Sequence, residues 1–187
     1  MLSRYESLLS SSPLLTKSIT AGFITAFGDV LSQLLEAHLA PSKIPFSLVR
    51  LGAFLLAGTF FIGPFMTYWF EVLWSIGRRL PKSWSKRSVT LTQVLVDQTA
   101  GVALFFPAFF FCYELCESLA SGRPRFPTLA VGKIRNDLPA ILVNQYKLWP
   151  LANFVSFSFV PVRYRVLYSN VMAVFWNIYL CAAVAAG

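Results

Sequence analysis

Five apolar segments separated by short polar connections dominate the hydrophobic pattern of this chain. The second segment, residues 51–70, contains no charged residue and has the length of about 20 residues that a helix needs to cross a hydrocarbon core. The first is interrupted by Lys17 and Asp29, and the third contains Asp97. We therefore expect helices whose charged positions lie against other helices. The five segments are residues 14–35, 51–70, 89–113, 138–160 and 166–186.

Prolines and one weak segment decide how many crossings the pattern predicts. Pro64, Pro107 and Pro150 each fall within a segment, where neighbouring helices satisfy the carbonyls that a proline leaves unbonded. The fourth segment carries Lys147 and Pro150, so it forms either a full span or a shallower bent one. The pattern predicts an all-α fold with one membrane domain over residues 1–187. That domain is a bundle of four to five transmembrane helices, several of them with proline kinks.

The composition supports this fold class. The chain has 187 residues, of which 56% are hydrophobic and 13% charged, and its mean hydropathy is +0.61. A soluble domain is about a quarter charged, so we expect an integral membrane protein.

The net charge of +8 is concentrated in short connections, which favours membrane topology and anionic lipid headgroups over nucleic acid. The expected headgroup contacts are Arg78, Arg79, Lys82, Lys86 and Arg87.

Motifs of catalysis or metal binding are missing from the sequence. It contains no glycine-rich phosphate loop, no paired histidines and no Gly-x-Ser-x-Gly turn. His38 is the single histidine, and one histidine does not build a metal site. Cys112, Cys116 and Cys181 are interpreted as apolar packing residues, since their number and spacing form no disulfide framework. We expect no enzyme, no catalytic residue, no cofactor and no metal.

Two carboxylates at membrane depth are the strongest functional candidates. Asp29 and Asp97 each cost several kcal/mol there unless paired or in contact with water. In one hypothesis they line a water-filled path, where they attract cations, carry protons or gate, with Lys147, Arg163 and Arg165 as available counter-charges. In the other they belong to a buried network that fixes helix register. The candidates for pore lining or gating are Asp29, Asp97, Gln98, Lys147 and Arg165.

Amide and aromatic side chains recur within the same apolar segments. Asparagines at membrane depth favour hydrogen bonds between helices over contact with a ligand. The expected interhelical network is Gln33, Asn153, Asn170 and Asn177. Trp and Tyr side chains suit a position at the membrane–water interface. The expected interface anchors are Trp149, Trp176 and Tyr179.

The order of these motifs resembles that of the family of Mpv-seventeen and the twenty-two-kilodalton peroxisomal membrane protein. The residues that carry the resemblance include Gly28-Asp29, Gly63-Pro64, Asp97-Gln98, Trp149-Pro150, Val160-Pro161 and Trp176-Asn177. One departure is Thr67-Tyr68-Trp69-Phe70, where the family often has His-x-Trp-Tyr. The resemblance implies a membrane protein of mitochondria, peroxisomes or plastids with a channel-like role.

Two functions from different classes remain open. The first is an organellar channel or pore-forming protein for small solutes or ions, with intramembrane carboxylates in selectivity or gating. The second is a non-catalytic structural or assembly subunit of a larger membrane complex. A partner that co-purifies stoichiometrically favours the subunit, whereas a lone monomer or homo-oligomer favours the channel. We expect the mitochondrial inner membrane first and the peroxisomal membrane as the alternative.

Overall fold

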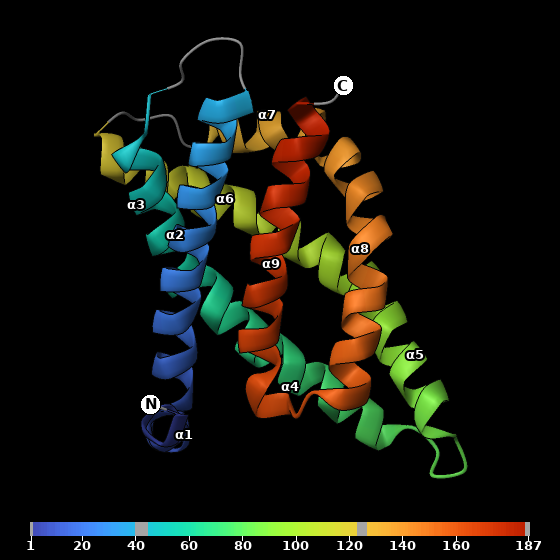
Figure 1. Ribbon diagram of the computed structural model, residues 1–187. Helices are drawn as coiled ribbons and strands as arrows, with labels where there is room; N and C mark the ends of the chain where they lie inside the picture. The colour runs from blue at the N-terminus through green and yellow to red at the C-terminus, as the bar shows by residue number, and fades with distance from the viewer. Residues whose placement is uncertain (1, 40–44, 123–126, 186–187) are drawn as a thin grey trace.

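Figure 1 shows a computed structural model of the chain that describes residues 2–39, 45–122 and 127–185. Every regular element within these ranges is helical, which confirms the all-α prediction. The elements are α1 (Leu2–Ser11), α2 (Pro13–Leu39), α3 (Leu48–Ala57), η1 (Gly58–Ile62), α4 (Gly63–Arg79), α5 (Lys86–Val96), η2 (Asp97–Gly101), α6 (Val102–Ser121), α7 (Thr128–Asn136), α8 (Leu138–Phe159) and α9 (Val162–Ala185).

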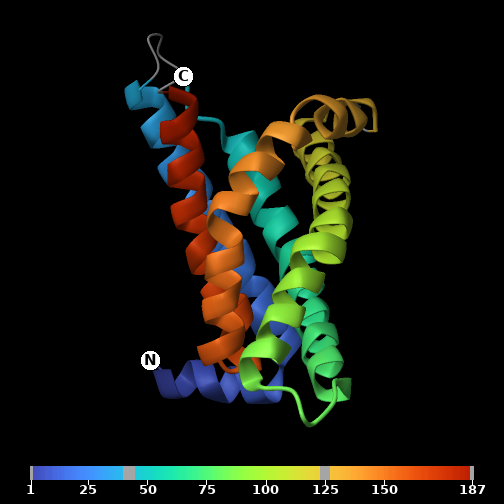
Figure 2. The same ribbon diagram turned by 90° about the vertical axis from the view of Figure 1, so that its right-hand side faces the viewer.

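Two long helices each contain one π-helical turn. The η1 turn joins α3 to α4, so that helix extends over Leu48–Arg79, and η2 joins α5 to α6 over Lys86–Ser121. Single π-turns of this kind are frequent at functional sites. Pro64 is the second residue of α4, just after η1, whereas Pro107 lies inside α6 and Pro150 inside α8. All three prolines therefore lie within continuous helices, and α8 changes direction along its length in Figure 2.

Three of the described helices are long and apolar enough to cross a membrane: Pro13–Leu39, Leu48–Arg79 and Lys86–Ser121. Helices α8 and α9 have 22 and 24 residues and extend beside them over most of the bundle (Figure 1). The outer surface carries large apolar side chains such as Phe23, Phe60 and Phe159, which are 67%, 72% and 77% exposed. Such a surface suits contact with lipid. The expected total of four to five crossings is not confirmed and stays a prediction.

The backbone of α2 lies directly against the η1 turn. A Cβ atom placed on Gly58 would lie 2.8 Å from Cα of Gly22 on α2, and one placed on Gly63 would overlap Cα of Ser18. Real Cβ atoms do not approach other heavy atoms this closely, so each position accepts only hydrogen. Small residues thus bring α2 and the second long helix together, as is common between membrane helices.

The two ends of the bundle differ. Helix α1 lies across one end, where the α4–α5 connection and the turn between α8 and α9 are also found (Figures 1 and 2). Helix α7 and the C-terminal end of α9 lie at the opposite end. All five basic residues expected to contact lipid headgroups, from Arg78 to Arg87, are exposed at the α1 end. Their contact with lipid stays a prediction.

Candidate functional site: a cavity with an aromatic and a polar wall

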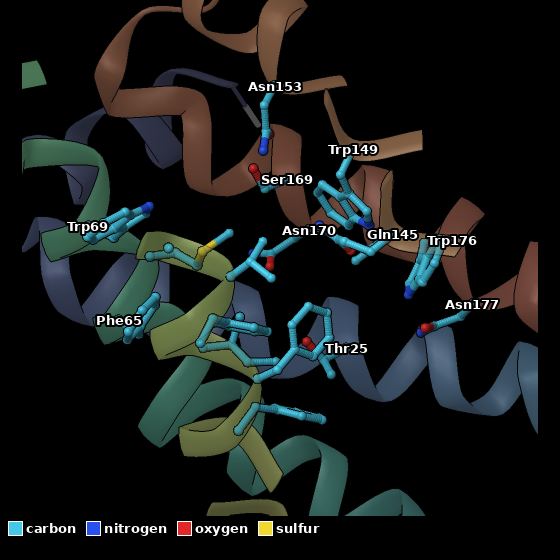
Figure 3. A pocket seen from close by; sticks show the side chains of 18 of the residues that line it. Thr25, Phe65, Trp69, Gln145, Trp149, Asn153, Ser169, Asn170, Trp176 and Asn177 are labelled. Carbon is cyan, nitrogen blue, oxygen red and sulfur yellow. The ribbon is translucent and has the colours of Figure 1, made fainter. Parts of the chain in front are cut away.

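A cavity of about 290 Å³ lies between the helices. One wall is aromatic and comes from α3, α4 and α6, whereas the other is polar and comes from α8 and α9 (Figure 3). The aromatic wall includes Phe54, Phe65, Trp69, Phe105, Phe106 and Phe109. The polar wall includes Gln145, Trp149, Asn153, Ser169, Asn170 and Asn177. The cavity therefore combines apolar surface with groups that donate or accept hydrogen bonds.

Asp97 lines this cavity and accepts hydrogen bonds from three uncharged side chains. The indole Nε1 of Trp69 donates to its Oδ1 at 2.7 Å, and Nε2 of Gln98 donates to its Oδ2 at 2.8 Å. Nδ2 of Asn153 on α8 donates to the same Oδ2 at 2.6 Å. Asp97 is only 9% exposed, and no ion pair involves it within the described part of the chain. Uncharged donors from three elements thus hold this carboxylate in place.

Local backbone packing explains how Trp69 reaches Asp97. Gly101 ends η2, one turn after Asp97, and a Cβ atom there would lie 2.9 Å from the Trp69 ring. The glycine leaves the space that the indole occupies. Phe65 also stacks on Trp69, with ring centroids 6.2 Å apart. The indole therefore packs against both a glycine and a phenyl ring, and its N–H donates to the carboxylate.

Three polar atoms on the α8 and α9 wall are buried without a hydrogen-bond partner among the described residues. They are Nε1 of Trp149, Oγ of Ser169 and Nδ2 of Asn170. Ser169 and Asn170 are 2% and 4% exposed. Most buried polar groups are satisfied, so an unsatisfied one in a polar cavity indicates water or a ligand. These atoms offer two donors and one hydroxyl to a molecule inside the cavity.

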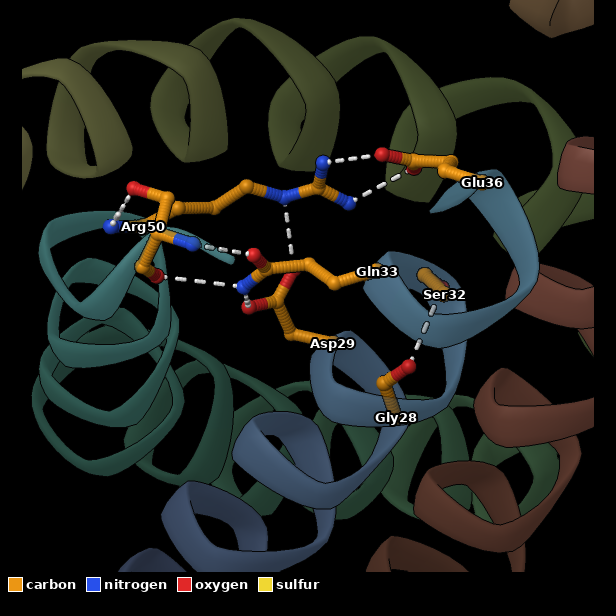
Figure 4. A network of polar contacts seen from close by, with 7 residues as sticks. Gly28, Asp29, Ser32, Gln33, Glu36 and Arg50 are labelled. Carbon is orange, nitrogen blue, oxygen red and sulfur yellow. Dashed lines mark hydrogen bonds and ion pairs between the residues drawn. The ribbon is translucent and has the colours of Figure 1, made fainter. Parts of the chain in front are cut away.

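Asp29 lies in a different network, which joins α2 to the start of α3 (Figure 4). Nε of Arg50 donates to Oδ1 of Asp29 at 2.6 Å, and both terminal nitrogens of Arg50 contact the Glu36 carboxylate at 2.6 and 2.9 Å. Gln33 donates to Oδ2 of Asp29 at 2.7 Å. Gln33 also accepts from the N–H of Ser47, the N-cap of α3, at 2.6 Å. Among the described residues that line the cavity, Asp29 is absent.

Lys147, Arg163 and Arg165, the counter-charges available in the pore hypothesis, form no ion pair with Asp29 or Asp97 in the described part of the chain. Asp29 pairs with Arg50, because the start of α3 lies beside the second half of α2. Lys147 is exposed and donates to Asn144 on its own helix at 3.0 Å. Arg165 is buried and donates to backbone carbonyls at the end of α8. Of the five residues proposed for pore lining or gating, Asp97 lines the cavity, and Gln98 is bonded to it.

The residues expected to form the interhelical network, and those expected to be interface anchors, divide between hydrogen-bond networks, the cavity wall and the surface. Gln33 and Asn153 bond to other elements as described above, whereas Asn170 and Asn177 line the cavity. The indoles of Trp149 and Trp176 line it too, with ring centroids 6.5 Å apart, and Trp176 is 8% exposed. These indoles therefore pack inside the bundle, and their position at the membrane–water interface stays a prediction. Tyr179 is 39% exposed, and its anchoring role stays a prediction.

Sequence reasoning missed most of the aromatic wall. Residues 104–111 lie within the apolar segment 89–113, whose pattern predicts a membrane helix but no cavity lining. Phe105 and Phe109 are four residues apart, so they share one helix face, and their rings stack at 5.8 Å. That spacing is a signal that could have indicated a lining face. Trp69 gave no signal as a partner of Asp97, because 28 residues separate them and only the fold brings them together.

The fold and the cavity define a helical integral membrane protein with an internal polar site, and comparisons with known proteins identify its family. The family profile described as Mpv17 / PMP22 matches residues 119–181. The chain is 32% identical to Protein SYM1 of Gibberella zeae over 176 residues, which cover 94% of this chain and 93% of that protein.

It is also 33% identical to the mitochondrial inner membrane protein Mpv17 of Drosophila melanogaster over 170 residues, covering 89% of this chain and 92% of the relative. Identity to peroxisomal membrane protein 2 of Bos taurus is 30% over 186 residues, covering 97% and 88%. No solved structure matches the chain at a comparable level of significance. The chain belongs to the Mpv17 / PMP22 family, as the order of its motifs indicated.

Proposed function

We propose that this protein is a channel or pore-forming protein of an organellar membrane, which conducts small solutes or ions through the cavity between α8, α9 and the two long π-containing helices. Asp97 acts in selectivity or gating. The protein has no catalytic role in this proposal. The proposal rests on the polar side of the cavity, where Asp97 and three residues with unpartnered buried polar atoms line the same space.

The physical argument concerns the free energy of burying polar groups. A buried donor or acceptor without a partner costs about 1–3 kcal/mol, and an apolar side chain of similar shape avoids that cost. Helices packed solely for stability would therefore carry apolar residues at Ser169 and Asn170. A path for polar solutes requires these groups, because they replace water around the solute as it passes. The aromatic wall supplies the apolar surface that solute-binding cavities usually have.

Asp97 is the charged group that we assign to the path. Its charge is not balanced by a cation in the described structure, and the three donors to it hold it at the cavity wall. The field of an uncompensated carboxylate attracts cations and repels anions. We propose no role in the path for Asp29, since Arg50 balances its charge.

The location is proposed from the names of the relatives. Three relatives bear the name mitochondrial inner membrane protein, from Drosophila melanogaster, Danio rerio and Xenopus laevis, and one from Bos taurus is named as peroxisomal. We place this chain in the mitochondrial inner membrane, with the peroxisomal membrane as the alternative. The exposed basic residues around the α4–α5 connection would contact anionic headgroups there.

Filling the cavity tests the proposed path. Ala173 on α9 lines the cavity, whereas Ala100 on η2 is exposed on the outside of its helix. Purified protein in planar bilayers should give discrete conductance, which Ala173→Phe lowers and Ala100→Phe leaves unchanged. Equal conductance in both variants would contradict a path through this cavity. Silence of the folded wild-type protein, with a stoichiometric partner that co-purifies in mild detergent, would favour the assembly subunit instead.

A further inference from the structure

Two buried basic residues lie on adjacent helices, outside the residues that line the cavity. Lys17 near the start of α2 and Arg165 near the start of α9 are each 6% exposed. Lysine and arginine are almost never this buried unless they are paired. Neither residue takes part in an ion pair with any residue that the structure describes. Their burial therefore calls for a physical reason.

The packing of α2 against α9 puts the two residues at the same height. Further along these helices, Gly28 of α2 lies against Val174 and Asn177 of α9. The two helices extend in the same direction (Figure 1). Eleven residues make about three turns, so Lys17 lies on the face of α2 that carries Gly28, three turns lower. The same step along α9 leads from Val174 and Asn177 to the positions on either side of Arg165.

The hydrogen-bonding groups of this pair are only partly used. Nε of Arg165 donates to the carbonyl of Val160 at 3.1 Å, and Nη2 donates to that of Phe157 at 3.3 Å. Nη1 is buried and has no partner among the described residues. The guanidinium carbon lies 5.1 Å from the centroid of the Phe157 ring. These contacts fix the orientation of the guanidinium and leave one nitrogen free.

The charge around the pair is unbalanced. Glu71 on α4 is the carboxylate that acts electrostatically on both cations, but it is exposed and forms an ion pair with neither. At this end of the bundle, two buried positive charges face one solvated negative charge. An anion bound beside the two cations would balance this excess of positive charge.

We propose that Lys17 and Arg165 form a binding site for a phosphate group. Arginine and lysine are the residues that proteins use to bind phosphate, and the free Nη1 and the lysine ammonium supply donors for two of its oxygens. The site lies at the end of the bundle crossed by α1, which is also the end that carries the α4–α5 connection (Figure 1). Either a soluble phosphate compound or the headgroup of an anionic lipid carries this group. The site does not depend on conduction through the cavity.

Thermal unfolding of the purified full-length protein in a neutral detergent tests the site. One titration uses inorganic phosphate at constant ionic strength, and the other uses phosphatidylglycerol against phosphatidylcholine. In at least one titration, the melting temperature of the wild type should rise to saturation. Lys17→Gln should weaken the apparent affinity at least about tenfold, because a charge-assisted hydrogen bond is lost. Lys17→Arg should largely retain the affinity.

The matched control is Arg163→Gln, which removes an exposed positive charge two residues from Arg165. It should titrate like the wild type. A response to phosphate assigns the site to a soluble compound, and a response to phosphatidylglycerol alone assigns it to lipid. Without either anion, Lys17→Gln should melt no lower than the wild type, since it removes an unpaired charge. Equal responses in Lys17→Gln and Arg163→Gln, no response in the wild type, or unfolding of Lys17→Gln would each overturn the proposal.

Discussion

Nδ2 of Asn153 on α8 donates a 2.6 Å hydrogen bond to Oδ2 of Asp97 on η2, across 56 residues of sequence. This bond joins the helix that forms part of the polar wall to the long helix that contains the carboxylate. Asn153 is 5% exposed, so the bond forms in surroundings where water competes weakly. This hydrogen bond therefore couples the position of α8 to the position of the Asp97 carboxylate.

Removal of Asn153 should loosen this link. Asn153→Ala leaves Asp97 with two donors instead of three, and we expect a loss of about 1–3 kcal/mol in the free energy of unfolding. Chemical unfolding of the purified protein in detergent measures this loss. Asn136→Ala, at the exposed end of α7, is the control and should change stability little. A loss as large in Asn136→Ala, or none in Asn153→Ala, would contradict the link.

Arg50 should be the most sensitive position of the α2–α3 network. Arg50→Gln leaves Asp29, which is 1% exposed, as a buried carboxylate without its cation. Breaking a buried pair on one side costs about 3–5 kcal/mol, and the 30% exposure of the Arg50 side chain favours the lower end. Arg50→Lys should recover only part of this, because lysine does not reproduce the contacts with Asp29 and Glu36.

A double variant separates charge from packing at this site. Asp29→Asn in the Arg50→Gln background removes the uncompensated charge, so it should restore part of the lost stability. Arg79→Gln, an exposed arginine at the end of α4, is the control for the change in net charge. If Asp29→Asn lowers the stability of Arg50→Gln further, the buried charge is not the cause of its loss.

Two glycines in the same long helix should respond in opposite directions to alanine. Gly58→Ala places a methyl group 2.8 Å from Cα of Gly22, and overpacking of this kind costs about 1–3 kcal/mol. A Cβ atom on Gly52 meets nothing within 4 Å, so Gly52→Ala should stabilise the helix by about 0.5–1 kcal/mol. Melting temperatures of the two variants in detergent provide the comparison. A stabilising Gly58→Ala would show that α2 does not contact η1 backbone to backbone.

The sequence predicted the helical fold class and indicated Asp97 as a functional candidate. It did not predict which groups form hydrogen bonds or ion pairs with the polar residues. Uncharged apolar runs of membrane length predict helices directly, since a bilayer leaves the backbone few alternatives. A carboxylate within such a run is a functional candidate because placing its charge at membrane depth costs free energy. Its partners are set by helix packing, so the Trp69 indole and the Asn153 amide could not be deduced from local pattern.

The cation that pairs with Asp29 could not be predicted from the sequence, for a related reason. Arg50 stands at the edge of an apolar segment, where a basic residue is typical of an interfacial flank. The structure turns it back towards α2, because Ser47 caps α3 and Gln33 binds the backbone of that cap. Such a contact depends on the path of the chain between the helices. Residue composition carries no information on that path.

The reversal potential of the channel in a potassium chloride gradient tests the central claim most directly. Wild-type protein should prefer potassium over chloride, and Asp97→Asn should shift the preference towards chloride in protein whose helix content and elution volume are unchanged. Asp137→Asn makes the same change in charge at an exposed position and should leave the reversal potential where it was. Identical reversal potentials for the wild type and a folded Asp97→Asn would contradict the assignment of Asp97 to the conducting path.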